Sequence, residues 1–142
     1  MQQIIIGREF SKVVTQLIKE AKQSVKILAY DWRWYPTDIG SSIQKFNLEI
    51  LHAVNRGVDI NVLLNGDGVF DDYVRKNIKI KRVHTKRIMH IKLIIIDEKT
   101  LVIGSHNLTK NAFELNHEMS VVLDDPVALS HCNRFFDDLC HL

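Results

Sequence analysis

The sequence predicts an α/β protein in which a mixed, partly parallel central sheet carries helices on both faces. Short, almost continuously apolar segments alternate with segments whose apolar residues recur at helical spacing. Strands that are apolar throughout are typical of a sheet covered on both sides. Strand candidates also cluster after residue 78, which indicates a mixed rather than a fully parallel sheet. The 142 residues suffice for one domain spanning 1–142.

Strand and helix alternate through the first half of the chain. The expected elements are a strand at 4–6, a helix at 10–21, a strand at 25–30, a helix at 43–54 and a strand at 58–64. Ser11 is a possible N-cap of the first helix, and Ser41 or Ser42 of the second. Gly57 is expected to end the second helix.

The second half begins with a strong turn signal, Asn65-Gly66-Asp67-Gly68. A short helix is expected at 71–76, followed by strands at 78–83, 89–96, 101–103 and 119–123. Asp125-Pro126 opens a final helix, because proline fits the first turn.

Charge is unevenly distributed along the chain. The net charge is only +2, yet residues 75–92 contain eight Lys or Arg residues and no Asp or Glu. Such a basic stripe attracts polyanions, including nucleic acid. Lysines that protect a sheet edge would give the same pattern.

Several broad classes are excluded by composition. The hydrophobic fraction of 46% is too high for a disordered chain. No apolar run approaches the roughly 20 residues that span a bilayer, so no membrane partner is expected.

Residues 1–8 do not resemble a signal peptide. Cys132 and Cys140 would lie about 12 Å apart along one helix, too far for a disulfide. We therefore expect a reduced, cytoplasmic protein.

The residues best suited to chemistry lie in and after the strand candidate at 89–96. In an extended strand His90 and Lys92 share one face, about 6–7 Å apart. Asp97 has the opposite parity, so a structural ion pair or hydrogen bond is expected for it. Ser105 and Asn107 share a face if their segment is extended. Together they offer a nucleophile or base, a cation, a hydroxyl and an amide, which suits attack on a phosphodiester.

The arrangement His90-x-Lys92-x4-Asp97-x6-Gly104-Ser105-x-Asn107 resembles the HKD signature of the phospholipase D superfamily. Its single copy and a later Asn116-x-Glu118 resemble the small bacterial endonucleases of the Nuc type. The resemblance implies a phospholipase D-like fold in which His90 attacks phosphorus and forms a phosphohistidine. Lys92 and Asn107 would bind phosphate oxygens, with Ser105 nearby. Glu118 would hold the other imidazole nitrogen of His90.

The resemblance also implies a partner, because the family's chemistry needs two such motifs and this chain has one. A two-fold homodimer that places His90 beside its symmetry mate would build one shared site. No metal or other cofactor is expected, since Lys92 and its mate supply positive charge. The histidines at 84, 90, 106 and 117 lack the spacing of a zinc ligand set.

Further residues are candidates for substrate contact. They are Lys86 and Arg87 in the basic stripe, His106 at the rim of the site, Thr109, Trp32 and Trp34. Thr109 suits a helix cap equally well. The tryptophans could instead anchor a dimer or lie at the rim of the core.

Three functions fit these observations. A nucleic-acid phosphodiesterase is favoured by the basic stripe. A lipid phosphodiesterase of the same superfamily and a nucleic-acid-binding module with an inactive site are the alternatives. The choice between DNA and RNA stays open, because basic residues give affinity for the backbone rather than base readout.

Overall fold

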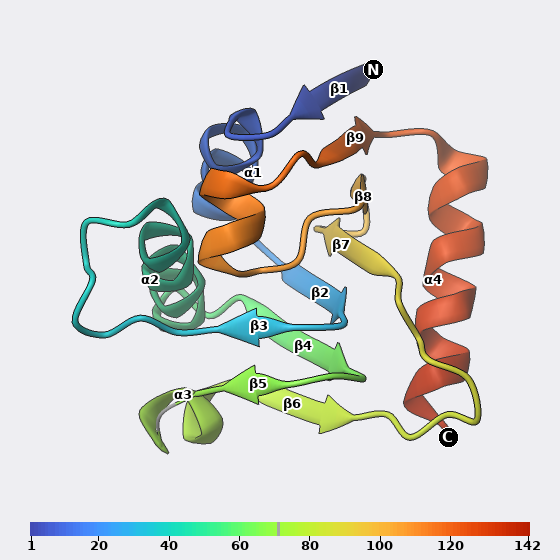
Figure 1. The fold of residues 1–142 in the computed structure, drawn as a ribbon. Helices are drawn as coiled ribbons and strands as arrows, with labels where there is room; N and C mark the ends of the chain where they lie inside the picture. Colours follow the sequence, from blue (N-terminus) through green and yellow to red (C-terminus); the bar gives the residue numbers. More distant parts are fainter. Residues whose placement is uncertain (71) are drawn as a thin grey trace.

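The computed structural model describes residues 1–70 and 72–142, and in these ranges seven strands form one mixed sheet. The strand order is β1-β9-β8-β7-β2-β4-β6 (Figure 1). The strands are β1 (Gln2–Ile6), β2 (Ser24–Ala29), β4 (Asp59–Leu64), β6 (Lys79–Arg82), β7 (Lys92–Ile96), β8 (Thr100–Gly104) and β9 (Met119–Leu123). Strands β2, β4 and β6 are parallel, whereas β7, β8, β9 and β1 pair in antiparallel fashion. The predicted mixed sheet is confirmed.

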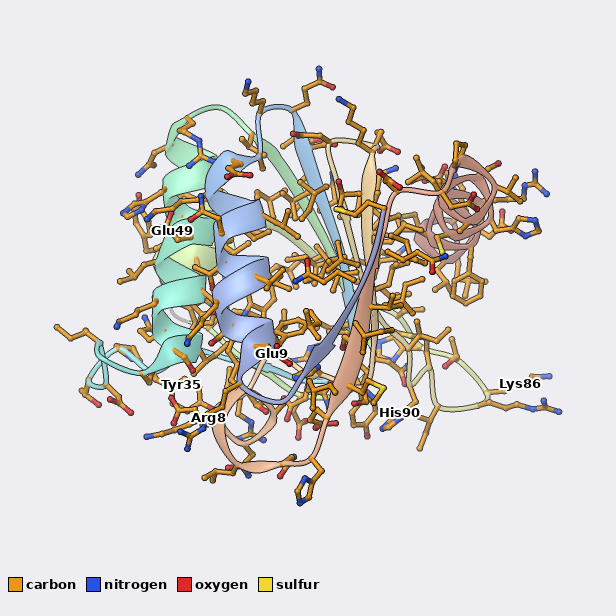
Figure 2. The ribbon with its side chains drawn as sticks, turned by 90° about the horizontal axis from the view of Figure 1, so that it is seen from above. Arg8, Glu9, Tyr35, Glu49, Lys86 and His90 are labelled. Carbon is orange, nitrogen blue, oxygen red and sulfur yellow. The ribbon has the colours of Figure 1, made fainter. Side chains whose placement is uncertain are left out.

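Helices cover both faces of this sheet, as the sequence predicts. Viewed with the sheet on edge, α1 (Glu9–Glu20) and α2 (Ser42–Asn55) lie side by side on one face, and α4 (Pro126–Cys140) lies on the other (Figure 2). Two short helices complete the described chain, α3 (Asp72–Asn77) and the π-helix η1 (Asn111–Leu115). Asp71, the first residue of the helix predicted at 71–76, lies outside the described residues.

Local sequence explains where most helices begin and end. Ser41 caps α2 by accepting a hydrogen bond from the Gln44 N–H, and Asp125 caps α4 in the same way. Gly57, with φ +91°, lies just after the C-terminus of α2. The prediction of a Ser11 N-cap is wrong: α1 begins at Glu9, and the Ser11 hydroxyl donates to the carbonyl of Arg8 within the first turn.

The strand predicted at 89–96 is shorter than expected. Strand β7 begins only at Lys92, because residues 89–91 leave the sheet. The Met89 N–H donates to Oδ1 of Asn65 at 2.9 Å. Ile91, which strict alternation would bury, is 41% exposed. Because His90 lies outside the strand, the alternation of side chains along β7 does not determine on which face its side chain lies.

A small second sheet was not predicted. Strand β3 (Trp32–Arg33) pairs in parallel with β5 (Gly68–Val69). The turn signal at 65–68 thus leads into a short strand, which positions the loop after β2.

Two apolar cores lie on the two faces of the sheet. The larger one packs α1 and α2 against it, with Val14, Ile18 and Phe46 fully buried. The smaller one packs Phe136 of α4 against Leu93 and other strand residues. Every residue of β7 is buried, so this strand is a fixed support for the residues at its two ends. Cys132 and Cys140 are free, as expected.

Candidate active site

His90 and Lys92 meet at the start of β7, through the lysine side chain rather than through strand parity. Lys92 is 8% exposed. Its Nζ donates to the His90 carbonyl at 2.8 Å and to Nδ1 of the imidazole at 2.9 Å. The His90 side chain is exposed, and its ring centroid lies 5.1 Å from that of Tyr30. An accessible imidazole is therefore held against a buried cation.

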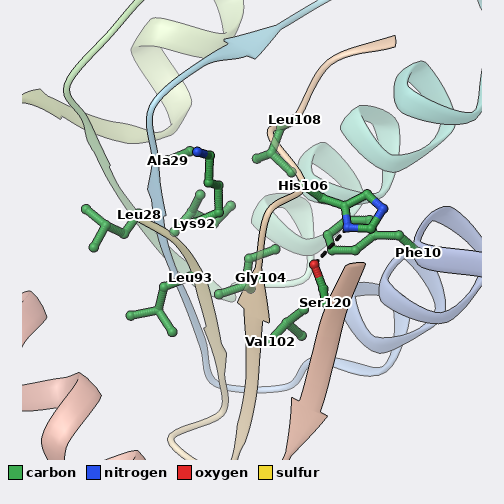
Figure 3. A pocket seen from close by; sticks show the side chains of 12 residues that line it. Phe10, Leu28, Ala29, Lys92, Leu93, Val102, Gly104, His106, Leu108 and Ser120 are labelled. Carbon is green, nitrogen blue, oxygen red and sulfur yellow. Dashed lines mark hydrogen bonds between the residues drawn. The ribbon is translucent and has the colours of Figure 1, made fainter. Parts of the chain in front are cut away.

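A row of small side chains makes space beside Lys92. Lys92, Gly104 and Ser120 are directly opposite one another on β7, β8 and β9. A Cβ at Gly104 would overlap the Ser120 side chain and the Met119 carbonyl, so the motif glycine is required for packing. Lys92, Gly104 and Ser120 are among the residues that line a small pocket of about 10 Å³ (Figure 3), at the lower limit for a single water molecule.

Burial lowers the pKa of Lys92, and the negative charge of Glu118 offsets this effect only in part. The ammonium has lost much of its hydration. A phosphate that enters this site would meet a charge that water screens poorly, so the attraction is stronger than at the surface.

Ser105 and Glu118 form a second pair near the lysine. The Ser105 hydroxyl donates to Oε1 of Glu118 at 2.6 Å and accepts from the Met119 N–H at 3.0 Å. Nδ2 of Asn116 donates to the other carboxylate oxygen at 3.3 Å. Among the described residues of one chain, Glu118 makes no hydrogen bond to His90. The contact implied by the family resemblance is thus not formed within this chain.

Asn107 lies in the loop after β8. Its Oδ1 accepts from the Asp31 N–H at 3.1 Å, which ties this loop to the end of β2. Its Nδ2 has no hydrogen-bond partner among the described residues and is free to donate to a ligand.

Asp97 lies at the opposite end of β7, about 17 Å from Lys92 along the strand. Its carboxylate accepts hydrogen bonds from the backbone N–H groups of Lys22, Gln23 and Ser24. Burial raises its pKa, but these hydrogen bonds and the charge of Lys22 outweigh that effect, so the pKa is lowered. This geometry agrees with the structural role expected from its parity.

The structure contradicts three of the expected substrate contacts. Trp32 and Trp34 are 0% and 6% exposed, and the Trp32 indole N–H donates to Oδ1 of Asn47 at 2.7 Å. Both belong to the larger core, where Trp32 packs against Phe46 of α2. His106 is 2% exposed, stacks on Phe10 at 4.2 Å and is hydrogen-bonded at both ring nitrogens, so it does not lie at the rim (Figure 3).

The remaining expected substrate contacts are Thr109, Lys86 and Arg87. Oγ1 of Thr109 accepts from the Ala112 N–H and caps η1, which is the alternative weighed for it. Lys86 and Arg87 are exposed, and Figure 2 shows Lys86 projecting away from His90. Sequence reasoning missed Tyr30, although its place just after a parallel strand is a common position for site residues.

Comparisons with known proteins identify the family and agree with this fold. Residues 14–140 match the family described as "Cardiolipin synthase, PLD-like domain", so the chain belongs to the phospholipase D-like family. A mitochondrial cardiolipin hydrolase of Chlamydomonas reinhardtii is 30% identical over 96 residues, covering 63% of this chain and 43% of that protein. A phospholipase D of Rickettsia prowazekii is 26% identical over 133 residues, covering 89% of this chain and 60% of that protein. The chain thus spans about half the length of these relatives.

Solved structures share the whole fold. Nuc from Salmonella typhimurium, described as a phospholipase D family member, superposes with a TM-score of 0.81 at 23% identity, over 99% of this chain and 95% of that one. NucT from Helicobacter pylori superposes with a TM-score of 0.79 at 21% identity, over 99% of this chain and 96% of that one. No helix in the described part of the chain is both long and apolar enough to cross a membrane.

Proposed function

We propose that this chain is a metal-independent phosphodiesterase that hydrolyses nucleic-acid phosphodiester bonds through a covalent phosphohistidine on His90. The observation that carries the proposal is the 2.9 Å contact between the buried Lys92 ammonium and the exposed imidazole. It puts a nucleophile and a poorly hydrated cation within reach of one phosphate group. The motif's resemblance to Nuc-type endonucleases and the basic stripe favour nucleic acid as the substrate.

The reaction has two displacement steps. A ring nitrogen of His90 attacks phosphorus, so that an N–P bond forms as the P–O bond to the leaving strand breaks. The leaving oxygen takes a proton from His90 of a second copy. Water then attacks phosphorus, the N–P bond breaks, and the second copy's His90 takes the proton from water. Lys92 and the free amide of Asn107 hold the non-bridging oxygens.

The contacts with Lys92 favour one resting tautomer of His90. The ammonium lies 2.9 Å from Nδ1 and 3.3 Å from Nε2, so Nδ1 is the better placed acceptor and we expect the proton of the neutral ring on Nε2. A bound phosphate would draw the ammonium to its own oxygens and free Nδ1 to carry the proton, which leaves Nε2 as the nucleophile. ¹⁵N NMR of His90 is expected to show this tautomer change on addition of inorganic phosphate. An unchanged tautomer in the bound state contradicts this step.

A shared site requires a homodimer, and the surface near Glu118 fits a partner. Ile6 and Met119 are directly opposite each other on β1 and β9 and are 53% and 55% exposed. Ile4, on the same face of β1, is 57% exposed, so the three side chains together give an apolar surface that a partner would cover. Sedimentation equilibrium is expected to show a dimer, and Ile6→Lys with Met119→Lys is expected to give an inactive monomer. A fully active monomer would exclude the shared site.

Hydrolysis of oligonucleotides in excess EDTA tests the proposed function. His90→Ala is expected to lower the rate at least about 1,000-fold. His84→Ala is the matched control, because that histidine is exposed in the neighbouring loop. A requirement for divalent metal excludes the mechanism. A chain that binds nucleic acid yet neither cleaves it nor yields a phosphohistidine after alkaline denaturing quench is the binding module with an inactive site.

A lipid phosphodiesterase is the second candidate. The description of the matched family and the names of two relatives favour it. Cardiolipin and phosphatidylcholine vesicles, assayed beside oligonucleotides, decide between the two substrates. Faster hydrolysis of either lipid than of any oligonucleotide would replace the first proposal.

A further inference from the structure

A basic groove lies outside the His90 site, between α1, the start of α2 and η1. Its volume is about 600 Å³. Four basic side chains line it, Arg8, Lys12 and Lys19 from α1 and the turn before it, and Lys45 from α2. All four are exposed. These cations lie outside the basic stripe at 75–92, so a charge count along the sequence does not reveal the groove.

The positive charge of the groove is largely uncompensated. Among the described residues, Lys12, Lys19 and Lys45 form no ion pair. The one acidic residue in the lining is Glu114, and its Oε1 accepts from the N–H and the hydroxyl of Ser42 at the start of α2. That carboxylate is therefore already bound at a helix N-terminus, where its charge is partly offset. The groove has the residue types that contact phosphate oxygens.

The groove ends close to the candidate active site. Arg8 follows Gly7, whose N–H donates to the carbonyl of Glu118 at 2.9 Å. Figure 2 shows Arg8 and His90 along the same edge of the molecule. From Arg8 to Lys19 the helix rises about 17 Å, which matches about five phosphates of one B-form strand. Lys12 and Lys19 are seven residues apart and therefore lie on the same side of α1.

We infer that this groove binds the sugar–phosphate backbone of the nucleic-acid strand whose scissile phosphate lies at His90; this inference rests on the proposed function. Substrate length then contributes to affinity, since a strand that extends beyond the site reaches the lysines of α1. A membrane surface fits less well, because the cations line a concavity and its one aromatic lining residue, Phe113, is 1% exposed.

Equilibrium binding of labelled strands to the His90→Ala protein tests the groove. Lys12→Gln with Lys19→Gln removes two of its cations. Lys22→Gln with Lys99→Gln is the control, because both lysines are exposed, lie outside the groove and give the same change in net charge. The groove variant is expected to bind a 20-nucleotide strand about 10-fold more weakly than the control. The slope of log affinity against log salt concentration is expected to be less negative than that of the unsubstituted groove by about 1.4 for a single strand or about 1.8 for a duplex.

A second comparison shows where the contacts lie. Binding of a tetranucleotide is expected to differ less than twofold between the groove variant and the control. Equal affinities and salt slopes of the two variants for the 20-nucleotide strand overturn the inference, as does an equal loss for the tetranucleotide. Lysine-dependent binding of phosphatidylglycerol vesicles without binding of either strand also overturns it, in favour of a lipid surface.

The proposed function is tested separately. Wild-type hydrolysis of bis(p-nitrophenyl) phosphate, lost in His90→Ala, depends on the catalytic pair and not on a long strand. If this hydrolysis occurs while the two lysine variants bind strands equally, the groove inference alone fails. If no diester is cleaved while the groove variant shows the expected loss of binding, the proposed function fails, and the groove remains only as a binding site for the strand, with no scissile phosphate at His90.

Discussion

Substitutions of Asp97 test whether this motif residue stabilises the fold without taking part in the reaction. The side chain lies about 17 Å from Lys92 at the far end of β7, too far to contact the same phosphate. Its Oδ1 accepts from the backbone nitrogens of Lys22, Gln23 and Ser24 at 3.1, 2.7 and 3.1 Å. We therefore expect Asp97→Ala to reduce stability and Asp97→Asn to reduce it much less, with hydrolysis per folded molecule retained in both.

The magnitudes follow from these contacts. Alanine loses three hydrogen bonds, each contributing about 1 kcal/mol. It must also adopt the left-handed conformation of this residue, φ 54°, which costs about 1 kcal/mol more. The sum is about 4 kcal/mol. Asparagine keeps an oxygen at the Oδ1 position and tolerates this conformation, so its cost is about 1 kcal/mol. For a domain of this size, these values correspond to falls in Tm of about 16 °C and 4 °C.

Urea denaturation at pH 7 measures these differences, with Asp138→Ala, an exposed aspartate on α4, as the control. The pH dependence has a defined sign. Because the folded pKa of Asp97 is below 3.8, its contribution is complete above that value and is lost as the pH falls through the folded pKa. The asparagine variant should lack this component. A loss below about 1 kcal/mol in Asp97→Ala, or a 100-fold loss of hydrolysis in folded Asp97→Asn, would refute the reasoning.

Three other substitutions test the site and its support. Lys92→Met keeps the buried stem and removes the cation, so kcat for phosphodiester hydrolysis should fall about 100-fold or more while Tm is maintained, as kinetics and thermal melts will show. In Gly104→Ala the new methyl overlaps the Met119 carbonyl, and urea titration should show about 1–3 kcal/mol of destabilisation; an unchanged midpoint contradicts this packing. Because burial lowers the pKa of His106, wild-type stability should decrease from pH 7 to pH 5, as the unfolded chain takes up a proton that the folded chain does not. His106→Asn should reduce this dependence, and exposed His52→Asn should not.

Elements that depend on local pattern are predictable from this sequence. Strand β9 occupies the predicted range 119–123, and α4 begins at the predicted Asp125-Pro126 pair. In both, apolar periodicity and capping are encoded within a few residues. Motif spacing likewise selects Lys92 and Asn107 as site candidates before their contacts are known, and their roles stay predictions.

Features that depend on distant contacts were not predictable in the same way. The start of β7 is displaced because Met89 is held by Asn65, twenty-four residues away. Trp32 follows a strand end that faces the site, yet Asn47 on α2 accepts its indole N–H and keeps the ring in the core. The basic groove combines residues from two helices, so its charge exists only in the folded chain.

Strand β7 connects the proposed role of Lys92 in phosphate binding with the structural role of Asp97. Because burial lowers the pKa of Lys92, the charged lysine opposes folding at neutral pH, and the same loss of hydration strengthens its attraction for phosphate. A site of this kind persists only where neighbouring interactions hold the strand in place. Packing of the four apolar residues of β7 at 93–96 and the three backbone hydrogen bonds to Asp97 supply that stability. In the proposed function, the His-x-Lys and Asp positions of the motif thus lie at opposite ends of β7, with the reacting residues at one end and the stabilising hydrogen bonds at the other.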